Sequence, residues 1–256
     1  MSLRAILFDL GDTLIDFEPM DTRAVFRMGA GSTYEFLLQR GYSMPPFEEY
    51  CRRQHSAVKW AYFWAKFKRK EFNSKHLLGE FCAKLGANLS VDELNQLAWL
   101  WYEPLTRHSS TEPETLDVLG ELRNSGLKIG LVSNTFIAPE IHDRHLDMLN
   151  LLELISVRVY SSEVGHRKPD PRIFQVALDQ LNVTASETIF VGDLIKTDIV
   201  GARRLGMKTV LKQPWGSARS HQKADIVIRS ISELPMALKL SESVADYCAD
   251  SKVAIA

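Results

Sequence analysis

Residues 5–14 read AILFDLGDTL, in which a run of four apolar residues ends at the acidic residue Asp9. A short, continuous apolar run is typical of a strand that is buried on both faces of a parallel sheet. A carboxylate that directly follows such a strand is held on a rigid scaffold at the rim of the sheet. Asp9 is therefore a candidate nucleophile or metal ligand.

Three further apolar runs end in small or acidic residues in the same way. They are residues 128–132 before Ser133, 157–160 before Ser161, and 188–191 before Gly192 and Asp193. Two more apolar runs, 209–211 and 226–228, would extend the sheet. In an open α/β sheet, ligands gather beyond the carboxyl ends of the strands, where these polar residues lie.

Helical segments are expected around the later strands. One is predicted over residues 112–124, entered through a capping box that begins at Thr111, and another over 171–181, with Asp170 as its N-cap. A last helix is expected from about Ser232. Because strands and helices alternate, the sequence predicts an α/β fold with a mostly parallel sheet.

The interval from about Asp16 to Leu105 breaks this alternation and shows helical spacing instead. Its clearest signal is an aromatic stripe at positions i, i+3, i+4 and i+7, made by Trp60, Phe63, Trp64 and Phe67. We expect an inserted helical subdomain in which the aromatic stripe faces the core. The basic residues of the same helix (Lys59, Lys66, Lys68, Arg69 and Lys70) would then face water.

The composition is that of an ordinary globular protein, with 45% hydrophobic residues in a chain of 256. The 31 basic and 32 acidic residues give a formal net charge of -1, so no overall attraction to nucleic acid or to an anionic membrane is expected. No apolar run approaches the length of a membrane span. Three scattered cysteines (Cys51, Cys82 and Cys248) disfavour a disulfide framework or a zinc site and favour a reduced, cytoplasmic compartment. The expected partner is therefore a small molecule.

The strand-end residues suit phosphoryl transfer, which needs an anionic attacking group and positive charge or donors around the phosphoryl oxygens. Ser133 and Asn134 are short donors that could bind a phosphoryl oxygen. Lys168 could neutralise both the nucleophile and the phosphoryl group. Asp193 and Asp198 form a pair of carboxylates after the same strand, an oxygen environment suited to Mg²⁺.

Taken together, four segments resemble the successive motifs of the haloacid dehalogenase-like hydrolases: FDLGDTL, LVSNT, KPDPRIF and VGDLIKTDIVGA, spread from Phe8 to Ala202. The resemblance implies a Rossmann-like core with a helical cap inserted after the first strand. The expected division is a discontinuous core of residues 1–15 and 106–240, a cap of residues 16–105, and a C-terminal tail of residues 241–256.

The resemblance also implies roles by motif position. Asp9 would be the nucleophile, Ser133 a catalytic residue that binds the phosphoryl group, and Lys168 the charge stabiliser, with Asn134 also binding substrate. Asp9 and Asp193 would bind Mg²⁺, with Asp198 supporting the metal site and the backbone carbonyl of Gly11 as a further ligand. The expected function is a Mg²⁺-dependent phosphatase that hydrolyses a small phosphorylated metabolite through an aspartyl-phosphate.

The sequence departs from the family pattern at one position. Phosphatases of the family usually carry a second aspartate two residues after the nucleophile, as the acid and base of the reaction, and this chain has Gly11 there. Asp12 is one position later, and adjacent side chains of an extended segment point in opposite directions. Three outcomes stay open: Asp12 reaches the site from an unusual turn, another group supplies the proton, or catalysis is poor.

Other functions are also compatible with parts of this pattern. A haloacid dehalogenase uses the aspartate without a metal, which the acidic pair Asp193 and Asp198 disfavours. A catalytically weak binding or regulatory protein would explain Gly11, but it has little need of Asp9, Lys168 and Asp193 together. A phosphomutase relies on the acid and base that Gly11 lacks.

Overall fold

The computed structural model describes residues 3–68, 70–213 and 224–239, and it contains the parallel sheet that the sequence predicts. Six parallel strands lie in the order β5-β4-β1-β6-β7-β8. Their bounds are Ala5–Phe8 (β1), Lys128–Ser133 (β4), Val157–Tyr160 (β5), Thr188–Gly192 (β6), Lys208–Lys212 (β7) and Ile226–Ile228 (β8). The tail predicted for residues 241–256 lies outside the described residues.

The central strand β1 is buried because helices cover both faces of the sheet. Ile6 and Phe8 point to one face, where they pack with Leu119 of α5 (Thr115–Asn124). Leu7 points to the other face and packs with Phe174 of α8 (Pro171–Leu181), beside α9 (Val200–Arg204). This alternation follows from the two-residue period of a strand. It explains why β1 reads as a continuous apolar run.

The remaining short elements connect these layers. They are α6 (Pro139–Met148), α7 (Ser161–Val164), a π-helical turn (Ile195–Ile199) and the 3₁₀ turns Leu152–Leu154, Ala185–Glu187 and Ile231–Glu233. The last of these turns continues as a helix over 234–239, as expected. Asp170 caps α8 by accepting a hydrogen bond of 3.0 Å from the backbone N–H of Arg172, so this N-cap prediction is confirmed.

The helix predicted over 112–124 begins later than expected, at Thr115, and no side-chain capping bond is formed at its start. Glu112 has other partners: its Oε1 lies 2.7 Å from Nζ of Lys212, and its Oε2 accepts hydrogen bonds from the Ser230 hydroxyl and from the backbone N–H of Ile231. The predicted capping box is therefore wrong, because the helix begins after these residues, with Glu114 in the N-cap position and no side-chain capping bond.

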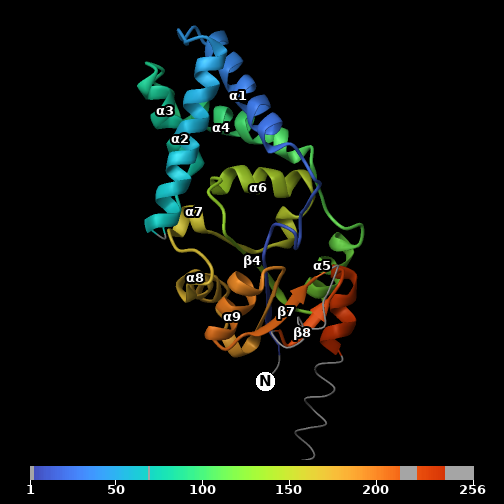
Figure 1. Cartoon of the computed structure of the whole chain (residues 1–256). Coiled ribbons are helices and arrows are strands. Elements are labelled where there is room, and N and C mark those ends of the chain that lie inside the picture. Colours follow the sequence, from blue (N-terminus) through green and yellow to red (C-terminus); the bar gives the residue numbers. More distant parts are fainter. Residues whose placement is uncertain (1–2, 69, 214–223, 240–256) are drawn as a thin grey trace, which may run out of the picture.

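Between β1 and β4 lies a helical insertion made of four helices (Figure 1). These are α1 (Thr22–Gln39), α2 (Phe47–Lys68), α3 (Ser74–Lys84) and α4 (Val91–Thr106). They enclose a second hydrophobic core, which includes Leu37, Tyr50, Leu78 and Leu97 and extends to Ile141 of α6. The predicted insertion of helices after the first strand is confirmed. Each helix among the described residues is too short or too polar to span a lipid bilayer.

The two connections to the insertion pair with each other as a short antiparallel ribbon, β2 (Asp16–Phe17) with β3 (Ser109–Ser110). The ammonium group of Lys212, at the end of β7, ties them to the core. Its Nζ donates to the Thr13 carbonyl at 2.9 Å and lies 3.1 Å from Oδ1 of Asp16 and 2.7 Å from Oε1 of Glu112. This buried lysine therefore holds both connections at once.

The aromatic stripe of α2 faces solvent and not the core. Trp60, Phe63, Trp64 and Phe67 are 46% to 74% exposed and contact one another edge to face. The same helix buries a different face, which carries Tyr50, Gln54 and Ala65. The prediction that the stripe faces the core is therefore wrong. Helical spacing defines a common face but does not say which face the rest of the chain covers.

Two buried histidines of α6 help to join the insertion to the core. Nδ1 of His145 lies 3.0 Å from the hydroxyl of Tyr102 on α4, and its Nε2 lies 2.8 Å from the hydroxyl of Ser109 on β3. Nε2 of His142 lies 2.8 Å from the Thr135 hydroxyl. Burial lowers the pKa of His142 to about 3 and that of His145 to about 4, so both rings are neutral at physiological pH.

These histidines should make the protein less stable in mild acid. Below pH 6.5 the unfolded chain takes up protons on them that the folded chain does not, so the free energy of unfolding falls as the pH falls toward 4. For the fully buried His142 the loss at pH 5 is about 2 kcal/mol. Urea unfolding at pH 7.5 and pH 5 should show this loss reduced in His142→Gln and retained in His76→Gln, whose ring is exposed. An equal acid loss in both variants would contradict the prediction.

Candidate active site

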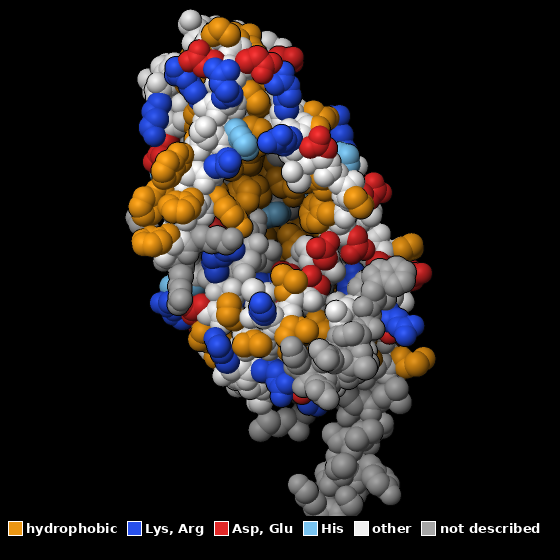
Figure 2. Space-filling model, viewed as in Figure 1, with side chains coloured by type: hydrophobic (Ala, Val, Ile, Leu, Met, Phe, Trp, Pro, Cys, Tyr) orange, Lys and Arg blue, Asp and Glu red, His pale blue; other side chains and the backbone are white. Residues whose placement is uncertain are grey.

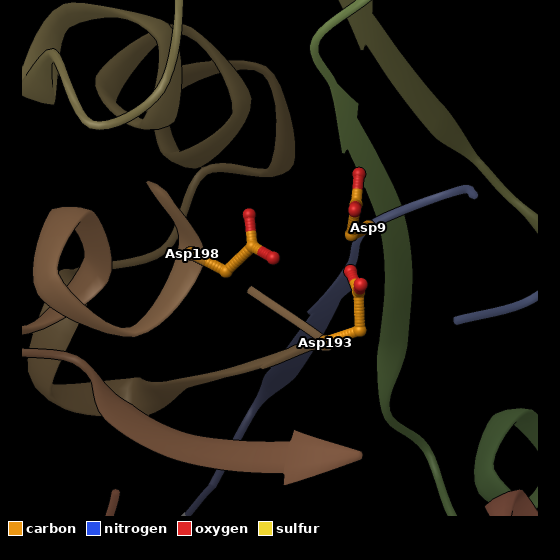
Figure 3. A group of neighbouring side chains, drawn as sticks. All are labelled: Asp9, Asp193 and Asp198. Atoms are coloured by element: carbon orange, nitrogen blue, oxygen red, sulfur yellow. The ribbon is translucent and has the colours of Figure 1, made fainter. Parts of the chain in front are cut away.

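The predicted site residues meet at the carboxyl ends of the three central strands. Phe8 of β1 pairs with Leu131 of β4 and with Val191 of β6. Asp9, Ser133 and Asp193 each lie one or two residues beyond these partners, so they reach the same edge of the sheet. Figure 3 shows the carboxylates of Asp9, Asp193 and Asp198 turned toward a common space.

The three aspartates form an acidic cluster. One carboxylate oxygen from each lies within 4.8 Å of the others. Asp198 is fully buried in the π-helical turn, and its Oδ2 accepts a hydrogen bond of 2.9 Å from the backbone N–H of Leu194. A Cβ on Gly192 would lie 2.6 Å from Cβ of Asp198. Glycine at position 192 is therefore needed for this carboxylate to approach β6.

Lys168 lies between two of the carboxylates. Its Nζ donates to Oδ1 of Asp9 at 2.6 Å and lies 2.9 Å from Oδ1 of Asp198, and its side chain is buried. Burial by itself would lower the pKa of this lysine, but the charges of Asp9 and Asp198 outweigh burial and raise it. Lys168 is therefore held as a cation beside the candidate nucleophile.

Asn134 clamps the loop that carries Lys168. Its side-chain Nδ2 donates to the Lys168 carbonyl at 3.0 Å, and its Oδ1 accepts from the Lys168 backbone N–H at 2.7 Å. The side chain of Asn134 is thus engaged with the backbone of the Lys168 loop. Its predicted contact with substrate stays a prediction, as does that of the buried Ser133 at the end of β4.

The electrostatics of the cluster favour a bound cation. Burial raises the pKa of Asp9, against the opposing charge of Lys168. Burial, followed by the charges of Asp9, Asp198 and Asp12, raises the pKa of Asp193 to about 7. Oδ1 of Asp193 is buried without a hydrogen-bond partner. Carboxylate oxygens that converge in this way fit a hard divalent cation such as Mg²⁺.

The segment after Asp9 turns sharply at the position where the sequence departs from the family pattern. Asp12 has a left-handed backbone with φ of 54°, and its N–H donates to the Ile15 carbonyl at 2.7 Å. Its side chain is exposed, yet its charge contributes to the raised pKa of Asp193. Asp12 therefore lies within electrostatic reach of the cluster. A role as acid or base stays a prediction.

A cavity of about 560 Å³ lies beside the Lys168 loop. It is lined by Ala65 of α2, by Asn134 and Lys168, and by Thr197 and Arg204 from the turn after β6 and from α9. Figure 2 shows the wider hollow between the helical insertion and the core, in which hydrophobic side chains gather. The volume is in the range of pockets that bind small metabolites.

Next to this site, Glu71 in the helical insertion and Arg167 in the core were not predicted from the sequence, and Ser161 of the core, which was placed at a strand end, was given no role. Glu71 contacts both core residues. A single glutamate between two helices has no local pattern that marks it, so only the packing of distant segments shows its position.

Comparison with known proteins agrees with the four motifs. The model of the haloacid dehalogenase-like hydrolase family matches residues 3–206. The chain is 27% identical over 226 residues to a ribulose-1,5-bisphosphate 5-phosphatase of Halopiger xanaduensis, covering 86% of this chain and 89% of the relative. It is 26% identical over 225 residues to a phosphoserine phosphatase of Thermus thermophilus, covering 81% and 88%.

Solved structures show the same fold. A HAD phosphatase from Thermococcus onnurineus aligns with a TM-score of 0.57 at 26% identity and covers 92% of this chain and 98% of its own. A 2-haloacid dehalogenase from Pseudomonas syringae aligns with a TM-score of 0.62 at 24% identity, covering 93% and 98%. The resemblance seen in the motifs is thus confirmed by a family match that runs from before β1 to beyond α9, and the chain belongs to the haloacid dehalogenase-like hydrolases.

Proposed function

We propose that the protein is a Mg²⁺-dependent phosphatase that hydrolyses a small phosphorylated metabolite through an aspartyl-phosphate on Asp9. The observation that carries this proposal is the contact of Asp9 with Lys168 inside the acidic cluster with Asp193 and Asp198. The relatives support the substrate class, because those named above are phosphatases of small metabolites.

In the proposed reaction, a carboxylate oxygen of Asp9 attacks phosphorus and the bond to the leaving oxygen breaks. Oδ1 of Asp9 accepts a hydrogen bond from Lys168, so Oδ2 is the oxygen that we expect to attack. Lys168 and Ser133 would stabilise the charge on the phosphoryl oxygens. Water then attacks the aspartyl-phosphate, which releases inorganic phosphate and restores the Asp9 carboxylate.

Mg²⁺ bound by Asp9, Asp193 and the carbonyl of Gly11 would offset the repulsion between the Asp9 carboxylate and the phosphate. Asp198 would act mainly as a support, because one of its oxygens lies against Lys168 and the other accepts from Leu194. The same cluster disfavours a metal-free dehalogenase, since the single positive charge of Lys168 does not balance three converging carboxylates.

We also infer that two parts of the chain have different functions. Residues 1–15 and 106–240 would form the catalytic core, and residues 16–105 a cap that helps to select the substrate. The scattered cysteines favour a reduced, cytoplasmic compartment, and in the described residues Cys51 and Cys82 are free thiols.

The test is phosphate release from p-nitrophenyl phosphate, acetyl phosphate and a panel of alkyl phosphates, with Mg²⁺ and with EDTA. We expect turnover that EDTA abolishes and added Mg²⁺ restores. Because Gly11 stands where the acid is expected, alkyl phosphates should react about 10² to 10⁴-fold more slowly than substrates whose leaving group needs no proton. Turnover that persists in EDTA, or halide release from a 2-haloacid in its place, would contradict the proposal.

A further inference from the structure

Glu71 is a buried carboxylate of the helical insertion that lies against the core. It belongs to the segment between α2 and α3, and its side chain is only 2% exposed. Its Oε2 lies 3.2 Å from Nε of Arg167 and accepts a hydrogen bond of 3.2 Å from the hydroxyl of Ser161. One insertion residue thus reaches two separate parts of the core.

Both partners of Glu71 adjoin the loops that carry the proposed phosphoryl-binding residues. Arg167 directly precedes Lys168 in the chain. The hydroxyl oxygen of Ser161 accepts a hydrogen bond of 2.8 Å from the backbone N–H of Thr135, which follows Ser133 and Asn134. Its single proton can go to Glu71 Oε2 or to the Thr135 carbonyl at 3.0 Å. Glu71 therefore lies where these two loops meet.

The residues that follow Glu71 dock on the core as well. The ring of Phe72 stacks on that of Phe136, with centroids 4.9 Å apart. The backbone N–H of Ser74 donates to the Phe136 carbonyl at 2.7 Å, and the Ser74 hydroxyl accepts from the backbone N–H of Ala138 at 3.2 Å. Glu71 is thus the charged end of a segment that lies along residues 134–138.

The buried ion pair of Glu71 is expected to contribute little to the free energy of folding. Its Oε1 is buried with no hydrogen-bond partner, and a buried ion pair often stabilises a protein less than apolar side chains in the same space. A contact of this kind is better suited to fixing the relative positions of the groups it joins.

We propose that Glu71 is a positioning residue that couples the seating of the helical insertion to the geometry of both phosphoryl-binding loops. With the insertion seated, the Glu71 carboxylate holds the Arg167–Lys168 loop and, through Ser161, the loop of residues 133–135. When the insertion moves away, both contacts are lost together and both loops are released. This inference rests on the proposed function only in the role it gives to these loops.

The first test measures hydrogen–deuterium exchange of the loop amides in the full chain, and it does not require enzymatic turnover. In Glu71→Ala both partners are lost, so amides of residues 133–137 and 165–170 should exchange faster. In Glu71→Gln the charge toward Arg167 is lost but an acceptor for Ser161 remains, so mainly residues 165–170 should exchange faster. Glu80→Gln is the matched control, because Glu80 is an exposed residue of α3 paired with His76. Unchanged exchange in both loops of Glu71→Ala would overturn the inference.

The second test uses p-nitrophenyl phosphate and separates positioning from a general loss of structure. Displacement of Lys168 should lower kcat of Glu71→Gln by roughly 10 to 10²-fold, with a smaller change in KM and unchanged exchange in the strands of the sheet. Arg167→Gln removes the same ion pair from the core side and should lower kcat similarly, which keeps the test valid if a Glu71 variant folds poorly. Wild-type kcat in both variants would overturn the inference. An inactive wild type with faster exchange in Glu71→Ala would instead refute the phosphatase proposal and leave the coupling supported.

Discussion

Replacement of Asp9 by asparagine is expected to abolish phosphate release, with a fall in kcat of roughly 10⁴ to 10⁶-fold. The amide cannot form the aspartyl-phosphate, and it offers Lys168 and the metal a neutral oxygen in place of a charged one. The measurement is single-turnover phosphate release from p-nitrophenyl phosphate at saturating Mg²⁺. In the wild type, acid quenching should trap phosphate bound to the protein, and Asp9→Asn should trap none.

The variant should stay folded, so the loss can be assigned to chemistry. Burial already penalises the ionised form of Asp9 and raises its pKa, so a neutral side chain costs little there. Lys168 keeps Asp198 as a charged partner at 2.9 Å. Thermal unfolding should therefore give a Tm close to that of the wild type. Turnover of Asp9→Asn within tenfold of the wild type would rule out Asp9 as the nucleophile.

Replacement of Gly11 by aspartate is expected to raise kcat/KM on alkyl phosphates by roughly 10² to 10⁴-fold, because it supplies the missing acid and base. The site has room for the side chain. Gly11 does not have a positive φ, and a Cβ there would meet only Cε2 of Phe17, at 3.7 Å. Position 11 is where the family pattern carries its acid and base, so a carboxyl there is expected to reach the leaving group.

The matched control for this variant is Gly11→Asn, which has the same shape but transfers no proton. It should give no gain on alkyl phosphates, and p-nitrophenyl phosphate should respond far less than alkyl phosphates in Gly11→Asp. A second comparison tests Asp12. Loss of alkyl turnover in Asp12→Asn would identify Asp12 as the wild-type acid and base. Equal gains in the aspartate and asparagine variants of Gly11 would contradict the proposed cause of the slow alkyl reaction.

The sequence is sufficient to predict the six strands of the parallel sheet, the helical insertion and the acidic and basic residues at the strand ends. These features can be predicted because each depends on residues that are close together in the sequence. An apolar run such as 5–8 is buried wherever a parallel sheet forms, and the residue that follows it must lie at the sheet edge. The positions of Asp9, Ser133 and Asp193 follow from this rule together with the parallel register.

The partners of the polar groups, in contrast, could not be predicted and are seen in the folded structure alone. Glu112, which was predicted to lie in a helix, forms an ion pair with Lys212, and Asn134 binds the backbone of the Lys168 loop. The spacing of the aromatic stripe of α2 is typical of a helix that packs on a core, yet the stripe faces solvent. The opposite face of α2 packs on the other helices of the insertion. Glu71 contacts Ser161, which is 90 residues away in the chain. Pairings of this kind depend on how distant segments pack, and local periodicity carries no information about that packing.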